Sequence, residues 1–224
     1  FDAKEISQLA AQLFNGWKNP PPFVRIPARF KDVPAGNAAI ETPDKANAYF
    51  TAALPPPIKQ DDPDYPALVL GDYLFGGGFL SSRFPARVRQ KDGLSYGAGS
   101  GLNADWFDRN GRFNVYAIAA PQNIARVEAA LKEELARVLK DGFTAEEVSA
   151  AKAGWLQEQQ VNRADGVTGA LRLYLFQGRT FNWDADLEEK IGALTPDAIL
   201  AAFRRHIDPS KLTIVKAGDF SKTK

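Results

Sequence analysis

The sequence contains no cysteine and only one histidine, His206, among its 224 residues. The absence of cysteine excludes disulfide bonds, thiol catalysis and zinc sites built from thiolates. A single histidine cannot supply a two-histidine motif such as H-E-x-x-H, so we expect no zinc ligands in this chain. His206 stands just before Asp208-Pro209, near the end of an expected helix, and is interpreted as a structural side chain.

A strong net charge and long apolar runs are also absent. Lys and Arg number 28 against 27 Asp and Glu, which leaves a formal net charge of +1. A charge so close to zero gives no reason to expect a nucleic-acid partner. No apolar run is long enough to span a bilayer as a helix, so we expect no transmembrane segment. One basic segment, from Arg83 to Lys91 with Phe79, Phe84 and Tyr96 nearby, keeps nucleic-acid binding as a third hypothesis.

The first 36 residues differ in pattern from the rest of the chain. Asp2 and Glu5 have the spacing of a capping box, and apolar residues then recur every three or four positions as far as Trp17. Prolines at positions 20–22, 27 and 34 follow and favour extended chain. We interpret residues 1–36 as an amphipathic helix followed by a linker or wrapping arm, and residues 37–224 as one domain.

Within residues 37–224, alternating patterns predict strands around 46–52, 94–102, 113–119 and 212–215. Helical patterns occupy 61–74, 80–91, 124–141 and a segment opened by Thr195-Pro196. A further helix is expected to begin with a capping box formed by Thr144 and Glu147 and to be interrupted at Gly166 and Gly169. This order predicts an α+β fold in which helices cover one face of an antiparallel or mixed sheet. The glutamate pairs at 133–134, 146–147 and 188–189 are interpreted as solvated helix faces.

The strand predicted from Leu94 to Leu102 carries glycine at every second position. Since these glycines share one face, that face has no side chains, which is typical of a place where a backbone or a ligand comes close. The opposite face is expected to show Tyr96, Ala98, Ser100 and Leu102. The three glycines are Gly97, Gly99 and Gly101.

Arg89 and Tyr96 are the candidate functional residues. Arg89 lies near the end of a predicted helix, and one turn separates it from Tyr96. A guanidinium and a phenol placed together can donate hydrogen bonds to the carbonyl oxygens of an extended peptide. The alternative is that Arg89 satisfies carbonyls at the helix end and that Tyr96 packs in the core.

Several segments between about residue 37 and residue 220 resemble the C-terminal half of pitrilysin/insulinase-type zinc peptidases, which include the mitochondrial processing peptidases. They are YPALVLGDYLFGGG, the run GGGFLSSRFPARVRQKDGLSYGAGS, GRFNVYAIAAP, LKDGFTAEEV and ALTPDAILAAFRRHIDPSKLTIVKAGDF. The resemblance implies the α+β half-domain of that family. The six-residue gap between Arg89 and Tyr96 matches the spacing of the arginine-tyrosine pair that the family has near its active site.

The resemblance also implies a division of labour. In that family another half, with an inverted H-x-x-E-H motif, binds zinc, so zinc is expected in a complementary N-terminal half or homologous subunit and no cofactor in this chain. Arg89 and Tyr96 would hold a peptide substrate there, and Tyr96 could stabilise the developing oxyanion. The chain alone is expected to be inactive. The alternative is a non-catalytic scaffold of the same family. The implied compartment is periplasmic or secreted, in a bacterium.

Overall fold

Five strands of the described chain form one mixed sheet. The computed structural model describes residues 2–18 and 21–221, except for the side chains of residues 79, 164 and 165. The strand order is β1-β5-β2-β4-β3, with β1 parallel to β5 and the other neighbours antiparallel. The predicted α+β fold with a mixed sheet is confirmed. The strands are β1 (Gly36–Glu41), β2 (Ala48–Leu54), β3 (Ser95–Ala104), β4 (Gly111–Ala119) and β5 (Thr213–Gly218).

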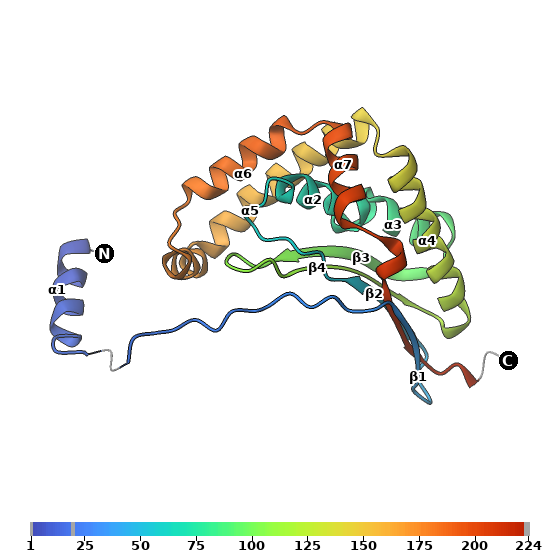
Figure 1. Cartoon of the computed structure of the whole chain (residues 1–224), viewed down its shortest axis with the longest axis horizontal. Helices are drawn as coiled ribbons and strands as arrows, with labels where there is room; N and C mark the ends of the chain where they lie inside the picture. The colour runs from blue at the N-terminus through green and yellow to red at the C-terminus, as the bar shows by residue number, and fades with distance from the viewer. Residues whose placement is uncertain (1, 19–20, 222–224) are drawn as a thin grey trace.

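Helices cover one face of this sheet, as Figure 1 shows. Alternate residues of β2 and β4 are buried, because one face of each strand points into the core beneath the helices. Seven segments of the described residues are α-helical: α1 (Ala3–Leu13), α2 (Tyr65–Asp72), α3 (Arg83–Pro85), α4 (Ile124–Asp141), α5 (Ala145–Gln177), α6 (Asn182–Ala193) and α7 (Pro196–His206). Two are π-helical, η1 (Tyr73–Gly77) and η3 (Ala86–Lys91), and three are 3-10 turns, η2 (Phe79–Ser81), η4 (Pro121–Asn123) and η5 (Pro209–Lys211).

The long helix α5 corrects the prediction of an interruption at Gly166 and Gly169. It begins with the predicted capping box between Thr144 and Glu147 and continues without a break for 33 residues. A helical glycine costs about 1 kcal/mol relative to alanine and requires no change of direction, so the rest of the helix can carry it. A second difference concerns α2, which continues as the π-helical η1 through Gly77 instead of ending at the start of the triple glycine.

The arm formed by residues 21–35, which precede β1, runs along the side of the sheet that the helices leave open (Figure 1). It contains no helix or strand. Arg25 of this arm donates two hydrogen bonds to Asp108 in the β3–β4 loop, at 2.5 and 2.7 Å. The arm is therefore fastened to the body of the domain, while α1 stands apart from it in Figure 1. The division of the chain at residue 36 stays a prediction.

Candidate functional site

Arg89 lies in the last turn of η3, immediately before the turn that leads into β3. The N–H of Asp92 donates to the carbonyl of Arg87 at 2.9 Å, and the N–H of Leu94 donates to that of Val88 at 2.7 Å. Val88 and Leu94 are buried on the two sides of this turn. Because these apolar side chains anchor the end of η3 and the start of β3, the intervening polar residues face outward. The side chain of Arg89 is exposed.

Tyr96 occupies a β-bulge at the start of β3. Ser95 pairs with Ala119 and Gly97 with Ile118, so the strand holds one extra residue at this point. The predicted alternation, which places Tyr96 on the same face as Ala98, is wrong here because the bulge shifts the register. Ala98 is 4% exposed and Tyr96 is 58% exposed. Tyr96 therefore does not pack in the core.

The two predicted residues thus project from elements that pack against each other, η3 and β3, on either side of one short turn. Both side chains are exposed. An arginine fork and a phenol presented in this way can donate hydrogen bonds to a bound peptide. Their role in binding stays a prediction.

The three glycines of β3 lie opposite side chains of β4. Gly97, Gly99 and Gly101 pair with Ile118, Tyr116 and Asn114. A Cβ atom on Gly99 would lie 3.0 Å from Cε1 of Tyr116, whereas one on Gly101 would lie 3.5 Å from Oδ1 of Asn114. Two groups therefore approach Gly99: the Tyr116 ring, which in turn stacks on Tyr49 at 6.4 Å, and the backbone oxygen of Gly76, which would lie 3.4 Å from the same Cβ. That a ligand also approaches these glycines stays a prediction.

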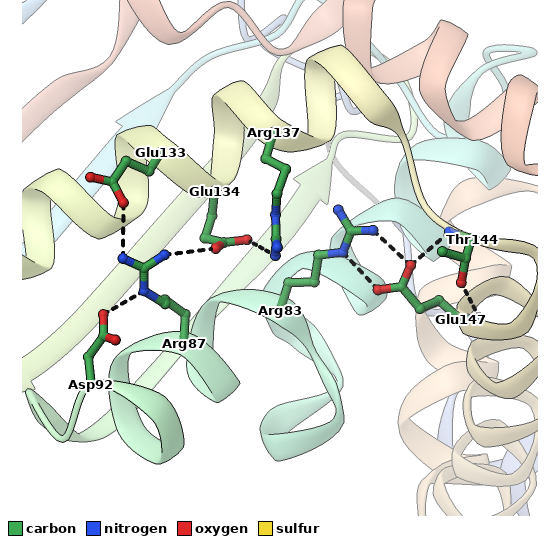
Figure 2. Close-up of polar contacts among 8 residues, drawn as sticks. All are labelled: Arg83, Arg87, Asp92, Glu133, Glu134, Arg137, Thr144 and Glu147. Carbon is green, nitrogen blue, oxygen red and sulfur yellow. Dashed lines mark hydrogen bonds and ion pairs between the residues drawn. The ribbon is translucent and has the colours of Figure 1, made fainter.

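The helical segment that carries Arg89 is held from behind by ion pairs to α4 (Figure 2). Arg87 donates to Asp92 at 2.5 Å, to Glu133 at 3.0 Å and to Glu134 at 3.4 Å. Glu134 is only 2% exposed and also pairs with Arg137. The interpretation of Glu134 as a solvated residue is wrong, because the arginines neutralise its charge beneath η3. These contacts fix the segment through Arg87, two residues before Arg89.

A second ion pair ties the same segment to the start of α5. Arg83 donates through Nε and Nη2 to both carboxylate oxygens of Glu147, at 2.8 and 2.7 Å. Glu147 also accepts from the N–H of Thr144 at 2.7 Å, completing the capping box (Figure 2). The Arg83 guanidinium lowers the pKa of Glu147 to about 2, and the hydrogen bond from Thr144 adds to this effect. Glu147 is therefore charged and paired at neutral pH rather than merely solvated.

These pairings also weaken the nucleic-acid hypothesis. Arg83 and Arg87 are engaged with carboxylates, and Phe84 is fully buried, so it offers no ring to a base. The side chain of Phe79 lies outside the described residues. The basic segment from Arg83 to Lys91 therefore offers less unpaired positive charge to a nucleic acid than its sequence indicated.

Asp72 is a notable group that sequence reasoning missed. It ends α2 and accepts hydrogen bonds from the Ser100 hydroxyl at 2.5 Å and from the N–H of Leu102 at 3.1 Å. Burial raises the pKa of Asp72 to about 6, although both hydrogen bonds oppose the rise. The signal was one carboxylate inside the apolar run LVLGDYLF. Asp72 joins the end of α2 to the edge strand β3.

Among the described residues, no group of three or more His, Cys, Asp or Glu side chains is placed to hold a metal ion. His206 accordingly has a structural environment, with Nε2 lying 2.8 Å from Oδ2 of Asp64 at the end of α7. In the same part of the chain, no helix is both long enough and apolar enough to cross a membrane.

Comparison with known proteins gives this geometry a context. The sequence profile described as "Peptidase M16 inactive domain" matches residues 1–154. An uncharacterized zinc protease of Streptomyces coelicolor is 32% identical over 162 residues, covering 70% of this chain and 34% of that protein. An uncharacterized zinc protease of Mycobacterium leprae is 41% identical over 76 residues, or 34% of this chain and 17% of that protein. The chain thus spans about a third or less of these relatives' length.

Two solved structures share the fold over nearly the whole chain. The peptidase M16 inactive domain from Pseudomonas fluorescens superposes with a TM-score of 0.82 at 26% identity, covering 97% of this chain and 52% of that chain. A protease from Helicobacter pylori superposes with a TM-score of 0.80 at 20% identity, covering 97% of this chain and 53% of that chain, a likeness that shows the fold alone. The family profile extends through the Arg89–Tyr96 segment, α4 and the N-terminal part of α5. The chain belongs to the family of inactive domains of M16 zinc peptidases.

Proposed function

We propose that this chain is the substrate-holding half of a zinc metallopeptidase and that a separate half supplies the zinc. That half, which would carry an inverted H-x-x-E-H motif, is called the companion half below. The observation that carries the proposal is the joint outward presentation of Arg89 and Tyr96 at the η3–β3 turn. The family membership of the chain and the names of its relatives support a role in proteolysis.

The chemistry divides between the two halves. The inverted H-x-x-E-H motif of the companion half would hold zinc, whose chemistry would be to activate a water molecule for attack on the peptide carbonyl. In this chain, the guanidinium of Arg89 would donate hydrogen bonds to backbone carbonyls and keep the peptide extended. The phenol of Tyr96 would donate to the carbonyl oxygen as negative charge develops on it. The bulge supports this role because it turns Tyr96 out of the core and leaves its hydroxyl available.

The segment behind these residues is suited to holding them in place. Arg87 of η3 pairs with α4, and Arg83 of the preceding α3 pairs with α5, so the helical segment that leads to Arg89 is fixed through carboxylates. A donor that is already positioned loses less entropy when it meets a charged transition state.

A periplasmic or secreted location also stays a proposal. One protein that shares the fold, PqqL of Escherichia coli, is a periplasmic protease (TM-score 0.73, 11% identity).

The test is peptide cleavage by the zinc-loaded companion half mixed with this chain. Arg89→Ala and Tyr96→Phe are each expected to lower kcat/KM at least about tenfold, and loss of one oxyanion donor costs about 100- to 1000-fold in other enzymes. Matched controls are Arg126→Ala, on the exposed face of α4, and Tyr49→Phe, on the open sheet face. If both site variants cleave as fast as the controls, the site assignment fails. If wild-type chain does not stimulate cleavage at all, a scaffold role is favoured.

A further inference from the structure

Helix α1 carries an apolar stripe that the described part of the chain does not cover. Most of its residues recur at steps of three or four positions, and the stripe continues into the turn after the helix. No residue of α1 is buried. The stripe consists of Ile6 (50% exposed), Leu9 (48%), Leu13 (70%), Phe14 (59%) and Trp17 (74%).

The stripe is not explained by the needs of an isolated helix. Asp2 caps α1 by accepting hydrogen bonds from Lys4 and Glu5, but a helix of 11 residues is marginal in water without tertiary contacts. Scattered exposed apolar residues are normal, whereas a contiguous stripe marks an interaction surface. The helix therefore requires a partner surface for its stability.

The arm that follows α1 is fastened to the domain by several contacts. Asp108 accepts two hydrogen bonds from Arg25 and one from the N–H of Ala28, at 2.6 Å. The guanidinium of Arg25 also lies 4.9 Å from the ring of Phe107, and Phe23 packs edge-on against Phe176 of α5 at 6.1 Å. These contacts fix the arm at the tip of the β3–β4 hairpin, and α1 stands apart from the body of the domain in Figure 1.

We infer that the α1 stripe is a docking surface for the companion half, presented by an arm that Asp108 clamps in place. The inference rests on the proposed function, because the companion half is part of that proposal. The companion half is the expected occupant of the stripe, because this chain covers only 52% and 53% of two solved relatives. The remaining length of those relatives is about that of a second half. A surface rich in Leu, Phe and Trp suits a permanent interface better than a transient one.

Binding of separately produced halves tests the inference. Leu13→Glu, in the centre of the stripe, is expected to raise the dissociation constant at least about tenfold, because it replaces a buried apolar side chain with a charge in the interface. Gln8→Glu makes the same charge change on the opposite face of α1 and is expected to alter affinity less than about twofold. Calorimetric titration measures both. The fluorescence of Trp17, isolated by comparison with Trp17→Phe, is expected to shift to the blue on binding.

The clamp has its own test. Asp108→Asn removes the charge that Arg25 binds but leaves the stripe intact, so affinity is expected to fall severalfold while the Trp17 shift at saturation is unchanged. Asp61→Asn is the matched control, because Asp61 is an exposed aspartate of the β2–α2 connection that also pairs with a basic side chain, Lys59. Circular dichroism of each variant checks that the body remains folded.

The outcomes separate this inference from the proposed function. Equal affinities for Leu13→Glu and Gln8→Glu overturn the docking surface, as does a failure of the wild-type halves to bind. A dimer of this chain that Leu13→Glu dissociates overturns the choice of occupant in favour of a second copy. Leu13→Glu is expected to recover wild-type cleavage when the companion half is saturating, whereas Tyr96→Phe is expected to bind normally and cleave slowly. Normal cleavage by Tyr96→Phe would overturn the function and leave the docking surface standing.

Discussion

Replacing Asp72 by asparagine is expected to remove a pH dependence of stability that the wild-type chain shows between pH 4 and pH 7. The carboxylate accepts from Ser100 and Leu102 but has lost much of its hydration between α2 and β3. Burial disfavours the charged form and raises the pKa of Asp72 from 3.8 to about 6. Asparagine keeps the size and one carbonyl acceptor but cannot ionise.

The sign of the effect follows from proton binding. Between pH 3.8 and about 6, the folded chain holds a proton on Asp72 that the unfolded chain has released, so unfolding becomes easier as the pH rises. The stabilisation that the neutral Asp72 carboxyl provides is complete below this pH window and is lost above it. At 1.36 kcal/mol per pKa unit, the difference corresponds to about 3 kcal/mol. Because Asp72 keeps some accessible surface, this is a ceiling.

The assay is urea unfolding followed by circular dichroism at several pH values between 4 and 7. The informative quantity is the free energy of unfolding of the wild type minus that of Asp72→Asn, because other titrating groups cancel in the difference. We expect this quantity to fall by about 1–3 kcal/mol from pH 4 to pH 7. A difference that stays constant across this range would refute the desolvation of Asp72.

Three further predictions concern the framework around the site. Glu147→Gln removes the pair with Arg83 and is expected to destabilise the chain by about 1–2 kcal/mol above pH 4.5, a modest cost because the pair is partly exposed. The deficit should vanish as the pH falls towards 2, because Glu147 of the wild type is then protonated as well. Denaturant titrations at pH 3 and pH 6 check the sign. Glu134→Ala should lower the free energy of unfolding by about 1–3 kcal/mol, because it leaves arginines without their buried partner. The control Glu133→Ala, at an exposed residue, should lower it by less than about 0.5 kcal/mol in the same titration. Gly166→Ala should stabilise α5 by up to about 1 kcal/mol, since a methyl group there meets nothing within 4 Å; an unchanged or lower thermal midpoint would argue against a continuous helix.

Much of the fold could be predicted because local pattern and final environment agree. The alternation of Phe113, Val115 and Ala117 reappears as the buried face of β4. The pair Thr144 and Glu147 forms the predicted capping box. In these elements the residues that favour the local structure are also the residues that the core requires, so no long-range information was needed.

The errors occur where a distant contact decides the outcome. Glu134 resembled its exposed neighbour Glu133 in sequence, and only the approach of Arg87 and Arg137 explains its burial. The bulge at Tyr96 depends on the pairing of β3 with β4, which a single strand does not encode. The candidate site was identified through a family resemblance and a spacing. The structure added the outward presentation of both side chains and the ion pairs behind them.

The most direct test of the central claim is the cleavage rate of an extended peptide by the zinc-loaded companion half, at saturating concentrations of this chain. With wild-type chain we expect turnover, and with the Arg89→Ala/Tyr96→Phe double variant we expect kcat to fall by at least about 100-fold while the zinc content stays the same. Turnover by the double variant within about twofold of the wild-type rate would contradict the claim that this half holds the peptide through these residues.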